Sequence, residues 1–445
     1  MWEELARAAA DDAGSPDALR ELQSLQVVYC QAWEYDDPCS RLAGRLGAEP
    51  VHRVYSGIGG WVPLRLLGGA AGAMASGDLD LALVVGGEAL ATRRHLPEPP
   101  WSFAPTEAAP FPISLDRDEA TNGIYQAYLT FALLDTARRA ARGLSPVEHR
   151  VELGRLLAPL SSVAAAHPEH AWFPIARSAE EITTTTADNR MVATPYTKLM
   201  TAIMDIDMAA AVLVATEERA DQLGVPTDQR VYLRGLGYGE EPPAMAARPD
   251  LGRSPAMQAA TTAALGSTDI DQVAHLDLYS CFASSLAFAQ DALGITDDRS
   301  LTVTGGLPYH GGPGSNYCTH SLAAMVENLR ADPGSKGLVT GIGMHMTHHA
   351  AALLSTEPGT LTVPAEPVAP EGVPVASGIG GTATIATHAT TYSREGPSWT
   401  ALICDLPDGS RCYARLDEPL IGDDDPLGRT VTLTSGKRGA INATL

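Results

Sequence analysis

The sequence has few cysteines, few aromatic residues and no long hydrophobic run, and these shortages exclude several classes of protein. Its six cysteines are scattered without a Cys-x-x-Cys pair, which argues against a disulfide framework and a structural zinc site. No apolar run approaches the roughly 18–20 residues that span a bilayer. The N-terminal stretch Met1–Glu4 has neither the basic start nor the apolar core of a signal peptide. We therefore expect a cytoplasmic protein with reduced thiols and no membrane partner.

Basic residues are also in short supply. The chain has 31 Lys and Arg against 53 Asp and Glu, which gives a formal charge of −22. A surface of that sign repels phosphate backbones and anionic lipid headgroups, so we expect no nucleic-acid partner. Any anionic ligand would need a local basic pocket or a helix N-terminus.

The 445 residues exceed what one hydrophobic core usually serves, so two or three domains are expected. Apolar strands alternate with amphipathic helices over residues 25–85 and again over residues 231–342. This pattern is typical of an α/β sheet with helices on both faces. A Gly-rich turn, helix, turn and apolar strand occur at Gly57–Val85 and again at Gly305–Ile342, which predicts two similar halves. The first half begins with a helix where a strand is usual, so we expect either that the sequence starts late or that this half lacks one strand.

Two further regions break this alternation. The prolines from Pro97 to Pro112 predict a rigid, extended entry into a helical insertion over residues 93–195. Prolines from Pro358 to Pro374 predict a semi-rigid linker, and the β-type runs after it, with a hairpin turn at Asp408-Gly409, predict a small barrel-like domain. The predicted divisions are 1–92 with 196–228, 93–195, 229–357, 358–381 and 382–445.

Residues 301–349 contain most of the side chains that could carry chemistry. A strand at Leu301–Val303 is predicted to lead into the Gly-rich loop 305–314, and a strand at Gly337–Ile342 into a loop with three histidines. Open α/β sheets bind their ligands at the carboxyl edge of such strands. The side chains expected there are those of Tyr279, Cys281, Tyr309, His310, Tyr317, Cys318, His345 and His349.

The two-half layout, the insertion after Gly86-Gly87-Glu88 and the re-entry at Ile206–Ala211 resemble the thiolase superfamily over roughly Met1–Ser355. More narrowly, the chain is similar to thiolase-like proteins of the acetyl-CoA acetyltransferase type that carry an extra C-terminal β-domain of the OB kind. The resemblance implies a duplicated five-layer αβαβα core, a helical insertion and a small all-β domain. It also implies a role in lipid metabolism, a coenzyme A or acyl-carrier thioester as substrate or ligand with no covalently bound cofactor, and a homodimer or a partner enzyme.

The residues that thiolases use for catalysis are replaced at all four matching positions. The nucleophilic cysteine aligns with Gly60, the histidine of Gly-His-Pro with Gly312, the asparagine of Asn-Glu-x-Phe with Tyr279, and the late cysteine with Gly341. The sequence therefore does not support ordinary cysteine-based thiolysis or Claisen condensation.

Other side chains are left as candidates for acid–base work on a thioester, including retro-aldol chemistry. The predicted catalytic residues are Tyr279, His310, His349, Cys281 and Tyr317. Glycines leave space and free backbone amides, so the predicted substrate-binding residues are Gly59, Gly60, Gly312, Gly341 and His345. The plainer interpretation is that these glycines permit turns and that the tyrosines and histidines pack as structural groups.

Three hypotheses for function stay open. The leading one is a thioester-binding protein without the thiolase cysteines, whose catalysis, if it has any, would be acyl transfer or retro-aldol chemistry on the thioester. The others are a non-catalytic scaffold for a partner enzyme and an acyltransferase that uses Cys281 or Cys318. We predict no metal site, because His345, His348 and His349 have no acidic or cysteine partner at a helical interval.

Overall fold

The first sheet of the computed structural model contains the N-terminal strands and one strand from beyond the insertion. The structure describes residues 1–96, 98, 116–361, 364–422 and 425–445, so most of the predicted proline-rich entry lies outside the described residues. The strand order is β2-β1-β3-β6, with β1, β2 and β3 parallel and β6 antiparallel to β3. The strands are β1 (Ser24–Val27), β2 (His52–Tyr55), β3 (Leu81–Ala89) and β6 (Asp207–Ala215).

A second sheet repeats this design. Its order is β7-β10-β9-β8, with β8 and β9 parallel and β10 antiparallel to both of its neighbours. The strands are β7 (Tyr232–Glu240), β8 (His275–Asp277), β9 (Lys336–Gly343) and β10 (His348–Ser355). Here β7 lies beside β10, whereas no described strand lies at the matching edge of β6 in the first sheet.

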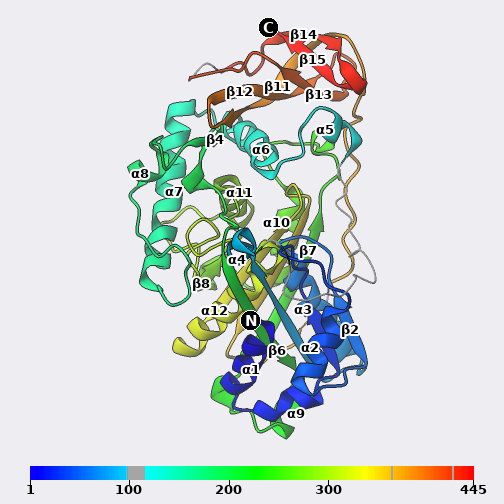
Figure 1. The fold of residues 1–445 in the computed structure, drawn as a ribbon, viewed down its shortest axis with the longest axis vertical. Helices are drawn as coiled ribbons and strands as arrows, with labels where there is room; N and C mark the ends of the chain where they lie inside the picture. The colour runs from blue at the N-terminus through cyan, green and yellow to red at the C-terminus, as the bar shows by residue number, and fades with distance from the viewer. Residues whose placement is uncertain (97, 99–115, 362–363, 423–424) are drawn as a thin grey trace.

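Helices separate and cover the two sheets in five layers (Figure 1). The outer face of the first sheet carries α1 (Trp2–Asp12) and α2 (Pro38–Leu46). Helix α9 (Glu217–Gln222) follows β6 in the chain. Between the sheets lie α3 (Val62–Ala75) and α12 (Tyr317–Ala331), which contact both. The outer face of the second sheet carries α10 (Pro255–Leu265), with α11 (Ala283–Leu293) beside it. This is a thiolase-like α/β fold.

The predicted insertion contains several helices and a short hairpin. They are α4 (Leu90–His95), α5 (Arg117–Thr121), α6 (Ala127–Ala141), α7 (Pro146–Ala166), α8 (Ala179–Thr183), β4 (Met191–Ala193) and β5 (Tyr196–Thr197). Helices α5 and α6 are separate, and α7 continues through Pro159.

A five-stranded barrel closes the chain at the top of Figure 1. Each strand pairs with the next in the ring β11-β12-β13-β15-β14, and β14 returns to β11. Its strands are β11 (Gly381–Ser393), β12 (Gly396–Asp405), β13 (Arg411–Leu416), β14 (Thr430–Ser435) and β15 (Ile441–Thr444). Closure of the ring is consistent with the OB-like domain that the resemblance implies.

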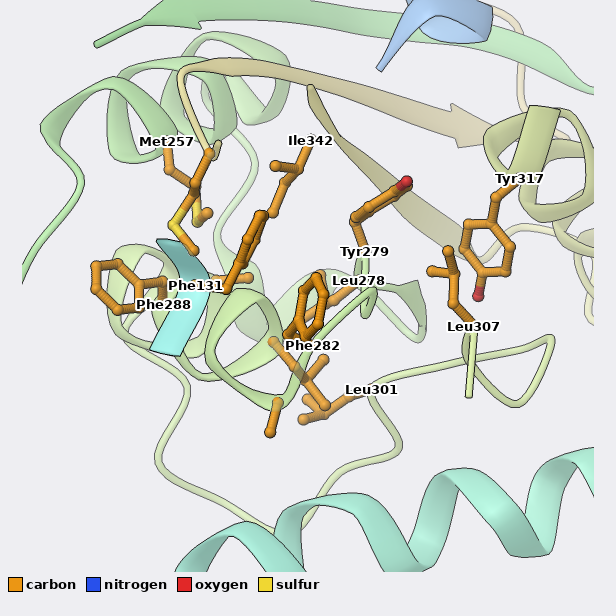
Figure 2. Packing of buried hydrophobic residues seen from close by; sticks show 14 of the residues in the cluster. Phe131, Met257, Leu278, Tyr279, Phe282, Phe288, Leu301, Leu307, Tyr317 and Ile342 are labelled. Carbon is orange, nitrogen blue, oxygen red and sulfur yellow. The ribbon is translucent and has the colours of Figure 1, made fainter. Parts of the chain in front are cut away.

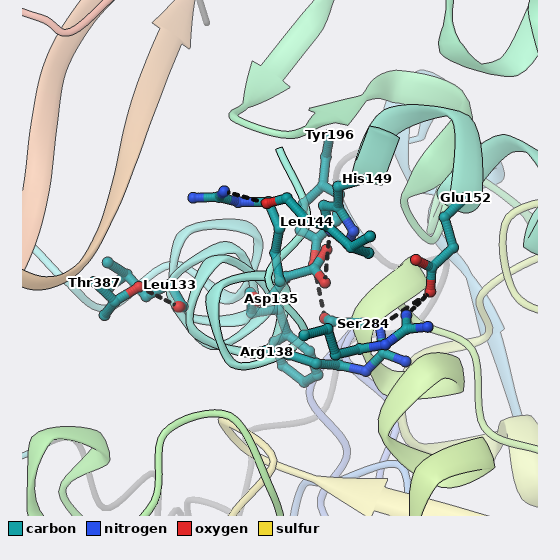
Figure 3. Close-up of polar contacts among 12 residues, drawn as sticks. Leu133, Asp135, Arg138, Leu144, His149, Glu152, Tyr196, Ser284 and Thr387 are labelled. Atoms are coloured by element: carbon teal, nitrogen blue, oxygen red, sulfur yellow. Dashed lines mark hydrogen bonds and ion pairs between the residues drawn. The ribbon is translucent and has the colours of Figure 1, made fainter. Parts of the chain in front are cut away.

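Buried polar contacts fasten the insertion to the barrel and to the second half (Figure 3). The Thr387 hydroxyl of β11 donates to the Leu133 carbonyl of α6 at 2.6 Å. Tyr196 and Ser284 are hydrogen-bonded at 2.7 Å through their hydroxyls. Within the described residues, no helix is both long and apolar enough to cross a membrane.

The predicted strand Leu301–Val303 is wrong. One oxygen of the Asp277 carboxylate, Oδ1, accepts hydrogen bonds from the amides of Val303 and Thr304 at 3.0 and 3.2 Å. The hydroxyls of Thr302 and Thr304 donate to the same oxygen. These backbone donors therefore serve a buried carboxylate and not a strand ladder, and the segment is an ordered loop.

Candidate functional site

The phenol of Tyr279 fills the space that a side chain at position 60 would occupy. A β-carbon built on Gly60 would overlap the hydroxyl oxygen and Cζ of Tyr279 and lie 2.7 Å from the Ile342 carbonyl oxygen. Gly60 lies just before α3, Tyr279 follows β8, and Ile342 is in β9, so three separate elements meet at this point. Figure 2 shows Tyr279 among the buried side chains of the second half, with Tyr317 and Ile342 nearby. The expected free space beside Gly60 is therefore occupied.

The space beside Gly341 is filled as well. A β-carbon on Gly341 would lie 2.9 Å from the Cα of Trp61 and 3.0 Å from the Sγ of Cys318. The Cys318 thiol donates to the Gly60 carbonyl at 2.9 Å. Burial raises its pKa well above the ordinary thiol value. Cys318 is therefore a protonated thiol that packs between Gly60 and Gly341.

Tyr279 and Tyr317 form an edge-to-face aromatic pair, with ring centroids 5.6 Å apart. The Tyr317 hydroxyl lies 2.6 Å from the Thr304 hydroxyl, which donates in turn to the Asp277 carboxylate. Burial raises the pKa of both phenols well above 10. Both tyrosines are therefore neutral at physiological pH, and each can donate a hydrogen bond but not act as a base.

His310 lies next to this pair but contacts a different partner. Its ring is 6.0 Å from that of Tyr317, and its Nε2 lies 3.4 Å from the Nδ1 of His320. Burial lowers the pKa of His310 to about 4. His310 is therefore a neutral imidazole packed against Tyr317 and His320.

His349 faces away from Tyr279. It lies opposite Ile342 in the β9–β10 ladder, and its Nε2 is 3.2 Å from the hydroxyl of Ser254, the N-cap of α10. Because α10 covers the outer face of the sheet and Gly60 lies on the inner face, the structure does not bring His349 together with Tyr279. His345 is likewise separate, with its Nδ1 3.6 Å from the buried Glu119 carboxylate.

Two of the predicted backbone donors are already engaged. The Gly59 amide donates to the Ser315 hydroxyl, and the Gly312 amide donates to the Ile203 carbonyl, both at 2.9 Å. Gly59 also has a φ of +145°, a conformation that glycine adopts without strain. These two glycines shape the turns around the site, and their amides are not available to a ligand in this structure.

Cys281 is not activated. Its Sγ lies 3.7 Å from the Ser285 hydroxyl, and burial raises its pKa to about 12. A thiol with so high a pKa is a weak nucleophile at neutral pH. Among the described residues, no group of three or more histidine, cysteine or acidic side chains is arranged to hold a metal ion.

Two residues that shape this site, Trp61 and Asp277, were not predicted from the sequence. Trp61 follows Gly60, and its ring stacks on His348 with centroids 4.7 Å apart. A β-carbon on Gly343 would overlap that ring, so the loop after β9 is shaped around Trp61. Asp277, at the end of β8, organises the Thr302–Thr304 loop. Glycine next to a large aromatic residue was a signal for Trp61; a buried aspartate before a Thr-x-Thr segment was the signal for Asp277.

Two open surface pockets lie elsewhere. Two pockets of about 390 and 420 Å³ lie along residues 183–189, one of them reaching Tyr392 of the barrel, and neither is lined by Gly60 or Tyr279.

Comparison with known proteins places this geometry in a family. No protein-family model and no curated protein sequence matches the chain. Among solved structures, the chain is 33% identical to a monomeric SCP2-thiolase-like protein type 1 from Mycobacterium smegmatis, with a TM-score of 0.87 over 100% of this chain and 95% of that one. It also superposes on an Ltp2–ChsH2(DUF35) aldolase, with a TM-score of 0.61, 16% identity and coverage of 80% and 92%. For the dimeric peroxisomal thiolase of Saccharomyces cerevisiae the TM-score is 0.55, the identity 15% and the coverage 80% and 91%.

The fold, together with the full-length match to one solved structure, defines a member of the thiolase superfamily. At 33% identity over its whole length, the chain belongs to the SCP2-thiolase-like proteins. The two more distant structures support the fold alone. One relative is monomeric and another dimeric, so the homodimer stays a prediction.

Proposed function

We propose that this protein binds a coenzyme A-type thioester through hydrogen bonding by Tyr279 and performs no cysteine chemistry on it. The observation that carries the proposal is the overlap between the Tyr279 phenol and any side chain on Gly60. In a thiolase-like fold the thioester carbonyl lies beside the nucleophile. A phenol at that place excludes a nucleophile on Gly60 and offers a donor to the carbonyl oxygen.

The protonation states around the site favour binding over acid–base catalysis. Tyr279 is a neutral donor because burial raises its pKa, and His310 is a neutral imidazole that touches His320 and Tyr317. No histidine or carboxylate among the described residues is hydrogen-bonded to the Tyr279 hydroxyl. A proton-transfer partner for retro-aldol chemistry is therefore not next to the phenol, and the raised thiol pKa of Cys281 and of Cys318 disfavours an acyltransferase.

The test is calorimetric titration of the full-length protein with acetyl-CoA and with free coenzyme A, which lacks the carbonyl. Tyr279→Phe should weaken acetyl-CoA binding about 2- to 12-fold, because one neutral hydrogen bond contributes about 0.5–1.5 kcal/mol. Binding of free coenzyme A should not change. The matched control is Tyr317→Phe, whose hydroxyl is bonded to Thr304 and should not affect the preference for acetyl-CoA. Absence of acetyl-CoA binding by the unmodified protein, or an equal loss for both ligands in Tyr279→Phe, contradicts the proposal.

A non-catalytic scaffold is the second candidate, and the first sheet favours it. Among the described strands, β6 pairs only with β3, so the nine-residue strand Asp207–Ala215 has one edge without a strand partner. Such an edge can accept a strand from another chain. Affinity purification that recovers a stoichiometric partner, together with no affinity for thioesters, would support this candidate over the first.

A further inference from the structure

We infer that Arg65 is an anion-binding residue beside the thioester site and that Glu366 of the linker occupies it in this structure. This deepens the proposed function, on which it rests for the identity of the ligand: the anion would be a phosphate group of the thioester's carrier. Arg65 lies in α3, one turn after Trp61, which itself follows Gly60. The residue is therefore on the helix whose start the Tyr279 phenol covers.

Aromatic side chains hold the Arg65 guanidinium in place. Its Cζ lies 4.2 Å from the ring centroid of Tyr238 in β7 and 5.5 Å from that of Trp61. Trp61 is fixed in turn by parallel stacking on His348 of β10, at an angle of 9°. Contacts with aromatic faces keep a guanidinium charged while limiting its rotamers. The cation is thus oriented before any anion arrives.

Glu366 behaves as an internal anion on this cation. Arg65 Nη2 donates to both carboxylate oxygens of Glu366, at 2.8 and 2.7 Å. The Glu366 side chain is 78% exposed, whereas that of Arg65 is 26% exposed. Among exposed ion pairs the net attraction is small, and a phosphate carries more charge and more acceptor oxygens than a carboxylate. A phosphate can therefore displace Glu366 from Arg65.

The linker is attached to the protein on both sides of Glu366. Before it, Arg234 of β7 donates to the Glu357 carbonyl at 2.9 Å. After it, the Val373 amide donates to the Ala247 carbonyl at 2.7 Å. Within the described residues between these two anchors, Glu366 makes the one ion pair. Release of Glu366 from Arg65 would leave the linker attached and free only its central part.

The overall charge makes a dedicated cation necessary. At −22 the surface repels anions, and burial lowers the pKa of the neighbouring His348, which adds no positive charge at neutral pH. Glu240 lies 3.4 Å from His348 and is a further negative group nearby. Arg65 is therefore a positive group among negative neighbours, placed where a phosphate can reach it.

The experiment is titration with inorganic pyrophosphate at low ionic strength, which tests the anion site without any thioester. Glu366→Gln should tighten pyrophosphate binding about two- to fivefold, because it removes the competing carboxylate. Arg65→Gln should weaken binding at least about tenfold. The matched control is Glu371→Gln, an exposed carboxylate of the same linker, which should bind pyrophosphate like the unmodified protein. Pyrophosphate binding that is unchanged in both Glu366→Gln and Arg65→Gln overturns the inference.

A second arm separates this inference from the proposed function. Coenzyme A carries phosphates, and pantetheine, its thiol-bearing part, does not. Glu366→Gln should tighten binding of coenzyme A and leave that of pantetheine unchanged. Equal effects on both ligands would refute the role of Arg65 while the thioester function stands. Pyrophosphate binding governed by Arg65, without any acetyl-CoA binding, would refute the thioester function and leave the anion site.

Discussion

Restoring a cysteine at position 60 should damage the fold unless Tyr279 is shortened at the same time. A β-carbon on Gly60 would overlap the phenol of Tyr279 and lie 2.7 Å from the Ile342 carbonyl oxygen. Overpacking of a well-filled core typically costs about 1–3 kcal/mol, and a backbone oxygen cannot move aside as a side chain can. We therefore expect Gly60→Cys to lower the free energy of unfolding by about 2–3 kcal/mol.

The double variant separates this clash from other effects. Tyr279→Asn alone should cost about 3–5 kcal/mol, because it leaves a cavity where the ring was. In Gly60→Cys with Tyr279→Asn the new side chain enters that cavity, so the combined loss should be smaller than the sum by about 1–3 kcal/mol. The loss of stability that remains in the double variant reflects the close contact between the new side chain and the Ile342 carbonyl oxygen.

Urea denaturation followed by near-ultraviolet circular dichroism measures these differences. The matched control is Gly69→Cys on the same helix, where a β-carbon would meet nothing within 4 Å. Since glycine is a poor helix former, that variant should be neutral or slightly stabilised. The packing argument is refuted if Gly60→Cys is as stable as Gly69→Cys. It is also refuted if the losses of unfolding free energy from the two single variants simply add in the double variant.

Three further predictions concern buried titratable groups. The pKa of His310 is lowered from 6.5 to about 4, so as the pH falls the unfolded chain takes up a proton at this histidine before the folded chain does. The free energy of unfolding should therefore decrease by about 2 kcal/mol between pH 7 and 5. Urea titrations at several pH values measure this decrease, and His310→Asn should remove it. For Glu88 the pH dependence of stability has the opposite sign, because burial raises the pKa of this carboxyl from 4.5 to about 7. The contribution of Glu88 to stability is therefore lost as the pH rises from 4.5 to 7. Thermal melts of Glu88→Gln should not show this loss. Asp135 is fully buried, and its Oδ1 lies 3.1 Å from His149 Nε2. In urea denaturation, Asp135→Ala should therefore lower the free energy of unfolding by about 3–5 kcal/mol, whereas the exposed Val151→Ala should lower it by at most about 0.5 kcal/mol. Equal losses in the two variants would contradict a buried pair.

Much of the secondary structure could be predicted from the sequence because it depends on local signals. Helix α10 (Pro255–Leu265) follows such signals, with Pro255 at its first position and Ser254 as N-cap. Strand β7 runs through three glycines as far as Glu240, where local propensity favours an earlier end. Its alternating glycines are required because carbonyls of α10 press directly against Gly235, Gly237 and Gly239. A contact between distant segments cannot be read from local propensity.

The candidate site was only partly predictable for the same reason. Alignment of motifs identified Gly60, Gly312, Gly341 and Tyr279 as replaced catalytic positions. That the Tyr279 phenol fills the space beside Gly60 depends on how β8 meets α3, which no local pattern encodes. His349 was grouped with Tyr279 because both follow strands of one sheet, and the ladder register places His349 on the opposite face.

Mass spectrometry of the intact protein after incubation with acetyl-CoA tests the central claim most directly. Because the Tyr279 phenol stands at the nucleophile's place and the neighbouring thiols stay protonated, we predict an unchanged protein mass under conditions where acetyl-CoA binds. Transfer of an acetyl group to Cys318 or Cys281 would contradict the account.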